Sequence, residues 1–298
     1  SGDSMTSARL MPMCPEALRM TERVEDDMAY YMRMLEIVYQ QADSFDMLHF
    51  HIDCLHYPLT RVHKRPNLTT LHGRLDLPGL VPLYDEFDDM PLVSISHSQR
   101  EPLPQAFWQG TIYHGLPSEL FTFQPRQGEY LAFLGRISPE KRVDRAIEIA
   151  RRLGMVLRIA AKINWFEREY FETQIEPLLD DPEIEFLGEI TQHEKDEFLG
   201  NAAALLFPID WPEPFGLVMI EAMACGTPVV AFASGAVPEI VDDGVSGYVV
   251  HSIEEAVEAV PRAMALDRAV VRRRFEERFD AARMTAEYVD LYRRLLQW

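Results

Sequence analysis

From residue 130 onward, short apolar runs alternate with stretches in which apolar residues recur at helical spacing. Runs of this length that are closed by turn residues are typical of buried strands. They are Leu131–Ile137, Leu157–Ile163, Ile184–Ile190, Ala204–Ile209, Pro228–Phe232 and Tyr248–Val250. Because the runs are apolar on both faces and helical stretches separate them, the pattern predicts an α/β fold with a doubly wound parallel sheet.

Two of the intervening stretches carry helix-end signals. Gly154 stands where a left-handed helix end is favoured, after apolar residues at helical spacing: Ala146, Ile149, Ala150 and Leu153. Thr191 and Glu194 form a capping-box pattern that predicts a helix through Leu199. Strand, helix and strand therefore repeat along this half of the chain.

The first 120 residues show a less regular version of the same alternation. A helical stretch from about Asp26 to Gln41 precedes four predicted strands: Asp46–Ile52, Leu68–Leu71, Leu92–Ser96 and Thr111–Tyr113. Proline and glycine between Leu116 and Glu129 predict a hinge, with the domain boundary near Phe123. We therefore expect a Rossmann-like domain at 1–123 and a second at 124–284. An amphipathic helix is expected at 285–298, with Tyr288, Leu291, Leu295 and Trp298 on related turns.

Composition favours a folded protein of two domains and argues against nucleic acid as a partner. The 298 residues exceed the usual size of one core. With 29 Lys and Arg against 48 Asp and Glu, the net charge of −19 repels a phosphate backbone. We expect neither a transmembrane helix nor a secretory signal. Cys14, Cys54 and Cys225 match neither a disulfide framework nor a zinc site, which favours the cytoplasm.

The first cluster of candidate chemistry follows the strand that begins at Leu131. Ligands of open α/β sheets bind beyond the carboxyl ends of the strands. Here Arg136 supplies a forked guanidinium and Lys141, five residues on, a mobile ammonium, and the two suit a diphosphate. A solvated basic loop is the alternative interpretation.

The second cluster, at 210–221, also comes directly after an apolar run. Glu213 lies in the loop, and Glu221 falls about two turns into the helix that begins around Gly216, so the two carboxylates can contact different parts of one extended ligand. Carboxylates accept hydrogen bonds from vicinal hydroxyls, and glycine allows a close backbone approach. The alternative makes Glu213 a first-turn helix charge and Glu221 a surface residue.

The third cluster consists of histidines that end the first two predicted strands. His49-Phe50-His51 ends one strand, and Thr69-Thr70-Leu71-His72-Gly73 ends the next. A His-x-His pair can bind a metal, but no carboxylate or cysteine follows at ligand spacing, so we expect no metal site. Core histidines with satisfied hydrogen bonds are the commoner case.

The first two clusters, in this order and separation, closely resemble the nucleotide-sugar domain of the retaining GT-B glycosyltransferases of family 4. The segment Glu213-Pro-Phe-Gly-Leu-Val-Met-Ile-Glu221 matches the E-x7-E motif of that family, and Gly235–Gly247 resembles its continuation. The resemblance implies a GT-B fold, in which two Rossmann-like domains face a cleft. It also implies that the last helix crosses back to the first domain.

The resemblance also implies roles for individual residues. Arg136 and Lys141 would hold the donor diphosphate, and His72 would face the donor sugar. The remaining assignments concern the sugar and the nucleoside: Glu213 for the transferred sugar, the backbone of Phe215, Gly216 and Leu217 for sugar and phosphate, Glu221 for the ribose, and the main chain of Ile190 for the base.

Two departures from the family pattern stand out. The loop Tyr113-His114-Gly115-Leu116 carries His114 where the family has asparagine, which puts a direct role for that loop in doubt. The family also opens with a strand, a glycine-rich loop, a helix and a second strand, and we expect this unit to be absent before Ser1. The N-terminal domain is therefore expected to be incomplete at its start.

The expected function is transfer of a sugar from a UDP- or GDP-linked donor to a hydroxyl of a sugar, lipid-linked or small-molecule acceptor. By resemblance, the anomeric configuration is retained and neither a metal nor another cofactor is needed. No basic amphipathic helix stands out, so membrane contact is expected to be peripheral at most. The alternative is a catalytically silent nucleotide-sugar-binding or assembly subunit. A phosphorylase or epimerase is a third reading.

Overall fold

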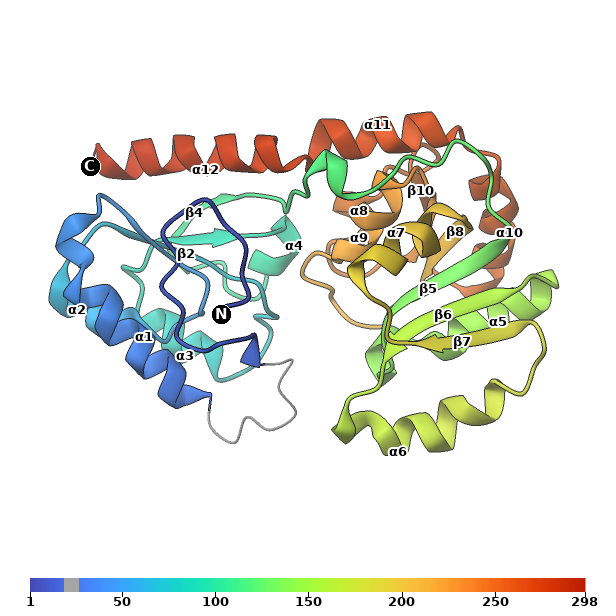
Figure 1. Cartoon of the computed structure of the whole chain (residues 1–298), viewed down its shortest axis with the longest axis horizontal. Coiled ribbons are helices and arrows are strands. Elements are labelled where there is room, and N and C mark those ends of the chain that lie inside the picture. The colour runs from blue at the N-terminus through green and yellow to red at the C-terminus, as the bar shows by residue number, and fades with distance from the viewer. Residues whose placement is uncertain (19–26, 298) are drawn as a thin grey trace.

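The predicted strands form two separate parallel sheets (Figure 1). The computed structural model describes residues 1–18 and 27–297. Within these residues, one sheet has four strands in the order β1-β2-β3-β4, and the other has six in the order β10-β9-β8-β5-β6-β7. All recorded strand pairs are parallel. The predicted α/β class with two doubly wound sheets is confirmed.

The first lobe is built on the four-stranded sheet. Its strands are β1 (Leu48–Phe50), β2 (Asn67–Thr70), β3 (Leu92–Ser94) and β4 (Trp108–Thr111). Its helices are α1 (Met28–Gln40), α2 (Tyr57–His63), α3 (Leu80–Glu86) and α4 (His97–Arg100). Leu68, Leu92 and Val93 have no exposed surface, because strands of a parallel sheet are covered on both faces.

The second lobe is built on the six-stranded sheet. Its strands are β5 (Tyr130–Arg136), β6 (Leu157–Lys162), β7 (Ile184–Gly188), β8 (Ala202–Phe207), β9 (Val229–Phe232) and β10 (Gly247–Val250). Its helices are α5 (Val143–Leu153), α6 (Arg168–Tyr170), α7 (Gln192–Gly200), α8 (Leu217–Ala224), α9 (Val237–Ile240), α10 (Ile253–Met264) and α11 (Arg268–Phe279). The strand order reverses between β5 and β8, which is where such sheets place their ligands.

Local signals fixed several helix ends as predicted. Gly154 ends α5 with a left-handed backbone (φ 61°). The capping box between Thr191 and Glu194 opens α7, since the Thr191 hydroxyl accepts the Glu194 N–H and the Glu194 carboxylate accepts the Thr191 N–H. Apolar side chains then fill a core layer on each face of the six-stranded sheet.

Most predicted strands agree with the structure to within two residues at each end, and two elements begin three or more residues earlier than predicted. The last strand of the first sheet ends at Thr111 and begins at Trp108, earlier than the apolar run suggested, because half-buried Trp108 and Gly110 pair with β3 at the sheet edge. The last helix, α12 (Ala281–Leu296), begins four residues before Thr285, because Asp280 accepts the Ala282 N–H and caps it. The predicted Asp26 and Trp298 ends lie outside the described residues.

Helix α12 leaves the second lobe and packs on the first (Figure 1). Its Leu291 is buried with Leu68 and Val93 of the first sheet. The predicted boundary near Phe123 falls in the segment that joins β4 to β5 and stays a prediction. The chain passes between the lobes twice, near Leu116 and near Asp280, and these two crossings are hydrogen-bonded to each other. Leu116 N–H donates to the Phe279 carbonyl at 2.9 Å, and Ala281 N–H donates to the Leu116 carbonyl at 3.0 Å.

The lobes also meet through Glu239, which precedes the end of α9. Its carboxylate accepts the backbone N–H groups of His97 at 2.8 Å and Ser98 at 2.7 Å, at the start of α4 in the first lobe. The Tyr113 hydroxyl donates to the same carboxylate at 2.9 Å. A carboxylate at a helix start satisfies N–H groups that have no partner within the helix. This contact holds the two sheets with their carboxyl edges toward each other.

The first lobe contains a fully buried histidine whose titration should contribute to its loss of stability in acid. His56 has no exposed surface and hydrogen-bonds Thr60 and Thr69, each at 2.8 Å. Burial lowers its pKa from 6.5 to about 3. Below pH 6.5 the unfolded chain therefore binds more protons than the folded one, and stability falls as the pH falls toward 3.

We expect His56 to remove about 2 kcal/mol of unfolding free energy between pH 6.5 and 5. Urea denaturation at pH 7.5, 6.5 and 5 measures this loss. His56→Gln should reduce the slope without abolishing it, because burial also lowers the pKa of His49 to about 3. His193→Gln, which changes an exposed histidine of α7, should leave the slope unchanged. An equal slope in wild type and His56→Gln would contradict the assignment.

Candidate active site

A cavity of about 590 Å³ lies between the lobes, at the point where the strand order of the second sheet reverses. Most of the predicted site residues line it: His72 from the first lobe, and Arg136, Lys141, Glu213, Phe215, Gly216, Leu217 and Glu221 from the second. The fold thus brings together side chains that are up to 149 positions apart (His72 to Glu221) in the sequence.

The two predicted cations come from the end of β5 and the turn after it. Arg136 is the last residue of β5, and its guanidinium contacts Glu140 at 3.0 Å and Glu167 at 3.6 Å. The Lys141 ammonium contacts the Glu213 carboxylate, and 85% of the Lys141 side chain is buried, since its relative exposure is 15%. An ammonium has three donors and a guanidinium five, so both groups keep donors for a ligand anion.

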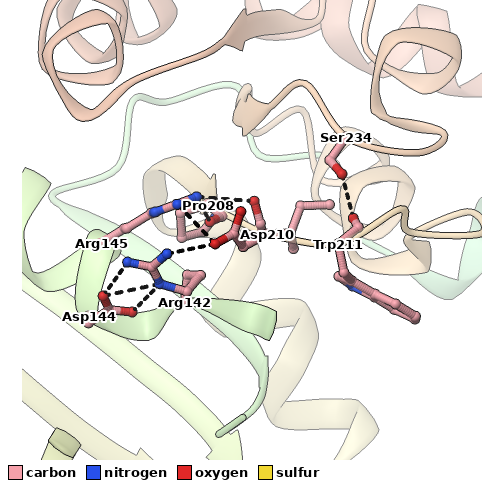
Figure 2. A network of polar contacts seen from close by, with 8 residues as sticks. Arg142, Asp144, Arg145, Pro208, Asp210, Trp211 and Ser234 are labelled. Carbon is pink, nitrogen blue, oxygen red and sulfur yellow. Dashed lines mark hydrogen bonds and ion pairs between the residues drawn. The ribbon is translucent and has the colours of Figure 1, made fainter. Parts of the chain in front are cut away.

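The loop that carries Glu213 is fixed at its start (Figure 2). Asp210 accepts hydrogen bonds from Arg142 at 2.8 Å and from Arg145 at 3.1 Å, both from the start of α5. The Ser234 hydroxyl donates to the Trp211 carbonyl at 2.6 Å. Within the loop, the Trp211 indole N–H donates to the Glu213 carboxylate at 2.9 Å. The position of Glu213 is therefore set by contacts from three elements.

Gly216 allows the loop to enter α8. It takes a left-handed backbone conformation (φ 85°), and a Cβ there would lie 2.7 Å from Met219 and 3.2 Å from Phe207. A side chain at this position would be strained on both counts. The first turn of α8 therefore presents backbone N–H groups toward the cavity that Gly216 lines, and such groups favour an anion.

Glu221 lies one helical turn further along α8 and is held by a lysine from α7. The Lys195 ammonium contacts one oxygen, Oε1, at 2.8 Å, and the two side chains are only 21% and 12% exposed. The second carboxylate oxygen is left for another donor, such as a hydroxyl. The surface reading of Glu221 is wrong, because its side chain is mostly buried and paired.

His72 lies two residues after the end of β2 and faces the cavity from the first lobe. Its Nε2 lies 2.7 Å from Nδ1 of His51, and its ring stacks on His114, with centroids 5.2 Å apart and an angle of 3° between planes. Desolvation in the cleft lowers the pKa of His72 below 6.5. His114 in turn contacts the ring of Phe215 edge-on at 4.9 Å.

Ile190 is the one predicted site residue that lines a different cavity. It follows β7 and borders a hollow of about 370 Å³ together with Tyr130, Arg158 and Glu197. Its side chain packs against the core layer below the sheet. The predicted contact of its main chain with a base stays a prediction.

Three residues that the sequence analysis left without a role also belong here. Lys195 and His114 line the cavity, and Trp211 holds Glu213. The capping box at Thr191 could have located Lys195 on the second turn of α7, but nothing in the pattern pointed that turn toward Glu221. His114 was discounted because the loop departs from the family sequence.

The described residues contain no group of three His, Cys, Asp or Glu side chains arranged to hold a metal ion. Among the helices that the structure describes, none combines the length and apolar character needed to cross a bilayer. The groups that line the cavity are three cations, two carboxylates, the start of α8 and two stacked imidazoles: Arg136, Lys141, Lys195, Glu213, Glu221, His72 and His114.

Residues 122–279, more than half of the chain, match the family model of glycosyl transferases group 1. The chain belongs to this family. The match spans β5 to α11 and thus contains Arg136, Lys141, Glu213 and Glu221. The first lobe, with His72, lies outside it.

Curated relatives of this group 1 chain include D-inositol 3-phosphate glycosyltransferases of actinobacteria. The protein of Mycobacterium leprae is 34% identical over 161 residues, which cover 49% of this chain and 38% of the relative. That of Mycolicibacterium gilvum is 67% identical over 42 residues, which cover 14% and 10%. The matched segments thus span less than two fifths of the length of these relatives.

Solved glycosyltransferases share the fold over most of the chain. HepE of Anabaena, solved with UDP and glucose, has a TM-score of 0.75 at 18% identity and covers 89% of this chain and 82% of its own. Sucrose-phosphate synthase of Thermosynechococcus elongatus has a TM-score of 0.75 at 18% identity and covers 90% and 79%. These likenesses and the two parallel sheets confirm the predicted GT-B fold.

Proposed function

We propose that this group 1 chain is a retaining glycosyltransferase of family 4 that moves a sugar from a nucleoside diphosphate to an acceptor hydroxyl. The observation that carries the proposal is the pairing of cations and carboxylates around one helix start in the cavity between the lobes. Arg136, Lys141 and the first turn of α8 suit a diphosphate. Glu213 and Glu221 suit the hydroxyls at its two ends.

In the proposed reaction, the bond between the sugar C1 and the phosphate oxygen breaks as the acceptor oxygen bonds to the same face of C1. The acceptor proton passes to a departing phosphate oxygen, so no side chain has to act as a covalent nucleophile. Negative charge grows on the diphosphate, and groups already placed around it stabilise that charge. Arg136, Lys141 and the start of α8 supply this stabilisation without a metal ion.

Positioning falls to the two carboxylates. Glu213, fixed by Trp211 and Lys141, is assigned to the hydroxyls of the transferred sugar. Glu221 accepts from Lys195 through one oxygen and is assigned to the ribose through the other. His72 faces the same cavity from the opposite lobe, where it meets the donor sugar. UDP in the HepE complexes supports a UDP-linked donor.

Calorimetric titration with UDP, GDP, ADP and their glucose or mannose conjugates tests the donor site without an acceptor. We expect UDP compounds to bind at the cavity, and Glu221→Gln to weaken their binding about tenfold through the loss of a charge-assisted hydrogen bond to the ribose. Glu255→Gln, which changes a carboxylate in the first turn of α10, is the matched control. Flat titrations with all three nucleotides would overturn the donor assignment.

An activity assay distinguishes the proposed transferase from the alternative function, a subunit that binds the nucleotide-sugar without reacting it. Hydrolysis of the UDP-sugar, or transfer to added acceptors, is expected for the transferase. Binding of UDP with neither reaction would instead favour a catalytically silent nucleotide-sugar-binding subunit.

A further inference from the structure

The ion pair between Lys195 and Glu221 lies on the wall of the cavity between the lobes. Lys195 comes from the start of α7 and Glu221 from α8, and the ammonium contacts one carboxylate oxygen, Oε1, at 2.8 Å. Both side chains are mostly buried, yet both line the cavity. The proposed donor site uses the carboxylate of this pair and gives the ammonium no ligand of its own.

The two charged neighbours of Lys195 in α7 are engaged elsewhere. The Glu194 carboxylate accepts the Thr191 N–H in the capping box. The Asp196 carboxylate accepts the Thr122 N–H at 2.7 Å. Of these three charged side chains, only that of Lys195 lines the cavity. It is therefore the one of the three that a ligand in the cavity can contact.

The local structure gives little reason for this ion pair. A cation near a helix start faces the positive end of the helix dipole. Glu221 interrupts an apolar run in α8, in which its neighbours Ile220 and Ala222 have no exposed surface. A mostly buried ion pair seldom stabilises a fold more than apolar residues of similar size, because both charges lose their water. Residues that break local rules in this way are typical of functional sites.

Together the two groups offer both kinds of hydrogen bond. The ammonium has three donors, and one of them serves Glu221. Among the residues that the structure describes, no partner is recorded for Oε2 of Glu221 or for the other two donors of Lys195. A hydroxyl can donate to the carboxylate oxygen and accept from the ammonium at the same time. The pair is therefore matched to a hydroxyl, whereas an ether or carbonyl oxygen satisfies the ammonium alone.

We propose that Lys195 is a specificity-determining residue of the donor site, which reads a ribose hydroxyl together with Glu221. The inference rests on the proposed transferase function and names what the site selects, a ribonucleoside diphosphate over its deoxyribonucleoside counterpart. One ribose hydroxyl donates to Oε2 of Glu221, and the same hydroxyl or its vicinal neighbour accepts from Lys195. A site built for a hydroxyl rejects a ligand that lacks it, because charged groups are then left without a partner.

Calorimetric titration of the full chain with UDP, 2′-deoxy-UDP and 3′-deoxy-UDP tests the proposal. We expect the wild type to bind UDP about 100-fold more tightly than at least one deoxy analogue, because two charge-assisted hydrogen bonds are lost. In Lys195→Met, which keeps a side chain of similar size but removes its donors, this ratio should fall to about tenfold. Lys162→Met, which changes a lysine that pairs with Glu189 outside the cavity, is the matched control and should keep the ratio.

The ratio of affinities separates a hydroxyl contact from other roles of Lys195. A contact with phosphate, or structural support of the site alone, would weaken UDP and both deoxy analogues equally in Lys195→Met. The ratio would then stay unchanged, which would overturn the proposal and leave the donor assignment standing. Absence of UDP binding to the wild type would instead overturn the donor assignment, on which the proposal rests.

A second variant keeps the test independent of folding. Lys195→Met leaves the Glu221 carboxylate buried without its cation, which is costly for the fold. The double variant Lys195→Met, Glu221→Met replaces both charges with apolar side chains of similar size and avoids this cost. It should bind UDP and its deoxy analogues with affinities within about twofold of one another, since neither hydrogen bond remains. Discrimination that persists in the double variant would show that other groups read the ribose, and the proposal would fail.

Discussion

Replacing Arg136 or Lys141 with alanine is expected to lower kcat/KM about 100- to 1,000-fold, the usual cost of removing one preorganised group that stabilises transition-state charge. Both side chains line the cavity beside the start of α8, where the diphosphate is proposed to gain charge. The effect should fall mainly on kcat, because the interaction strengthens as the bond to C1 breaks. Steady-state kinetics with a UDP-sugar measures it.

Lys162→Ala is the matched control for this prediction. Lys162 ends β6, the neighbouring strand, and contacts Glu189 at 3.6 Å, but it does not line the cavity. Its loss should change kcat/KM less than twofold, since an exposed pair contributes roughly 0.2–1 kcal/mol. Normal turnover in both Arg136→Ala and Lys141→Ala would remove the diphosphate assignment.

The largest effect on stability is expected from Arg268→Met. Arg268 opens α11, is only 6% exposed, and donates to the carbonyls of Gln124, Gly200 and Ala202 at 2.7 to 2.9 Å. It also donates to the Thr227 hydroxyl at 2.6 Å. Methionine fills similar space but leaves these buried acceptors unpaired. We expect the free energy of unfolding to fall by about 3 kcal/mol.

Urea denaturation of the variant measures this loss. Arg273→Met, which changes an exposed arginine of the same helix, should stay within about 0.5 kcal/mol of the wild type. If both variants unfold at the same urea concentration as the wild type, the four hydrogen bonds of Arg268 are not a major source of stability.

The sequence predicts the second lobe better than the first. Between Leu131 and Val250, buried runs alternate with helices that carry their own end signals, and local chemistry such as the Thr191 capping box decides the boundaries. The first sheet has shorter strands, and the edge strand β4 is built from half-buried residues whose polarity hides it. Its pairing with β3 is a long-range contact that no local pattern records.

The difference between local patterns and long-range contacts also explains which site residues the sequence predicted. Arg136 ends a strand, Glu213 lies in a loop that follows a strand, and Glu221 lies in the helix that this loop opens, so topology alone places them at one edge. Lys195 depends on how α7 packs against α8, and His114 on how the two lobes face each other. Both depend on tertiary packing, and neither follows from spacing along the chain.

The paired chain crossings at Leu116 and Asp280 have a mechanical consequence. The two connecting segments run side by side and are hydrogen-bonded to each other. They therefore act as one two-stranded connection between the lobes, and not as two independent linkers. Such a two-stranded connection bends readily in one direction and resists twisting of one lobe relative to the other. Widening of the interlobe space is therefore restricted to a single axis, and α12, which begins just after the crossing and packs on the first sheet, moves with the first lobe.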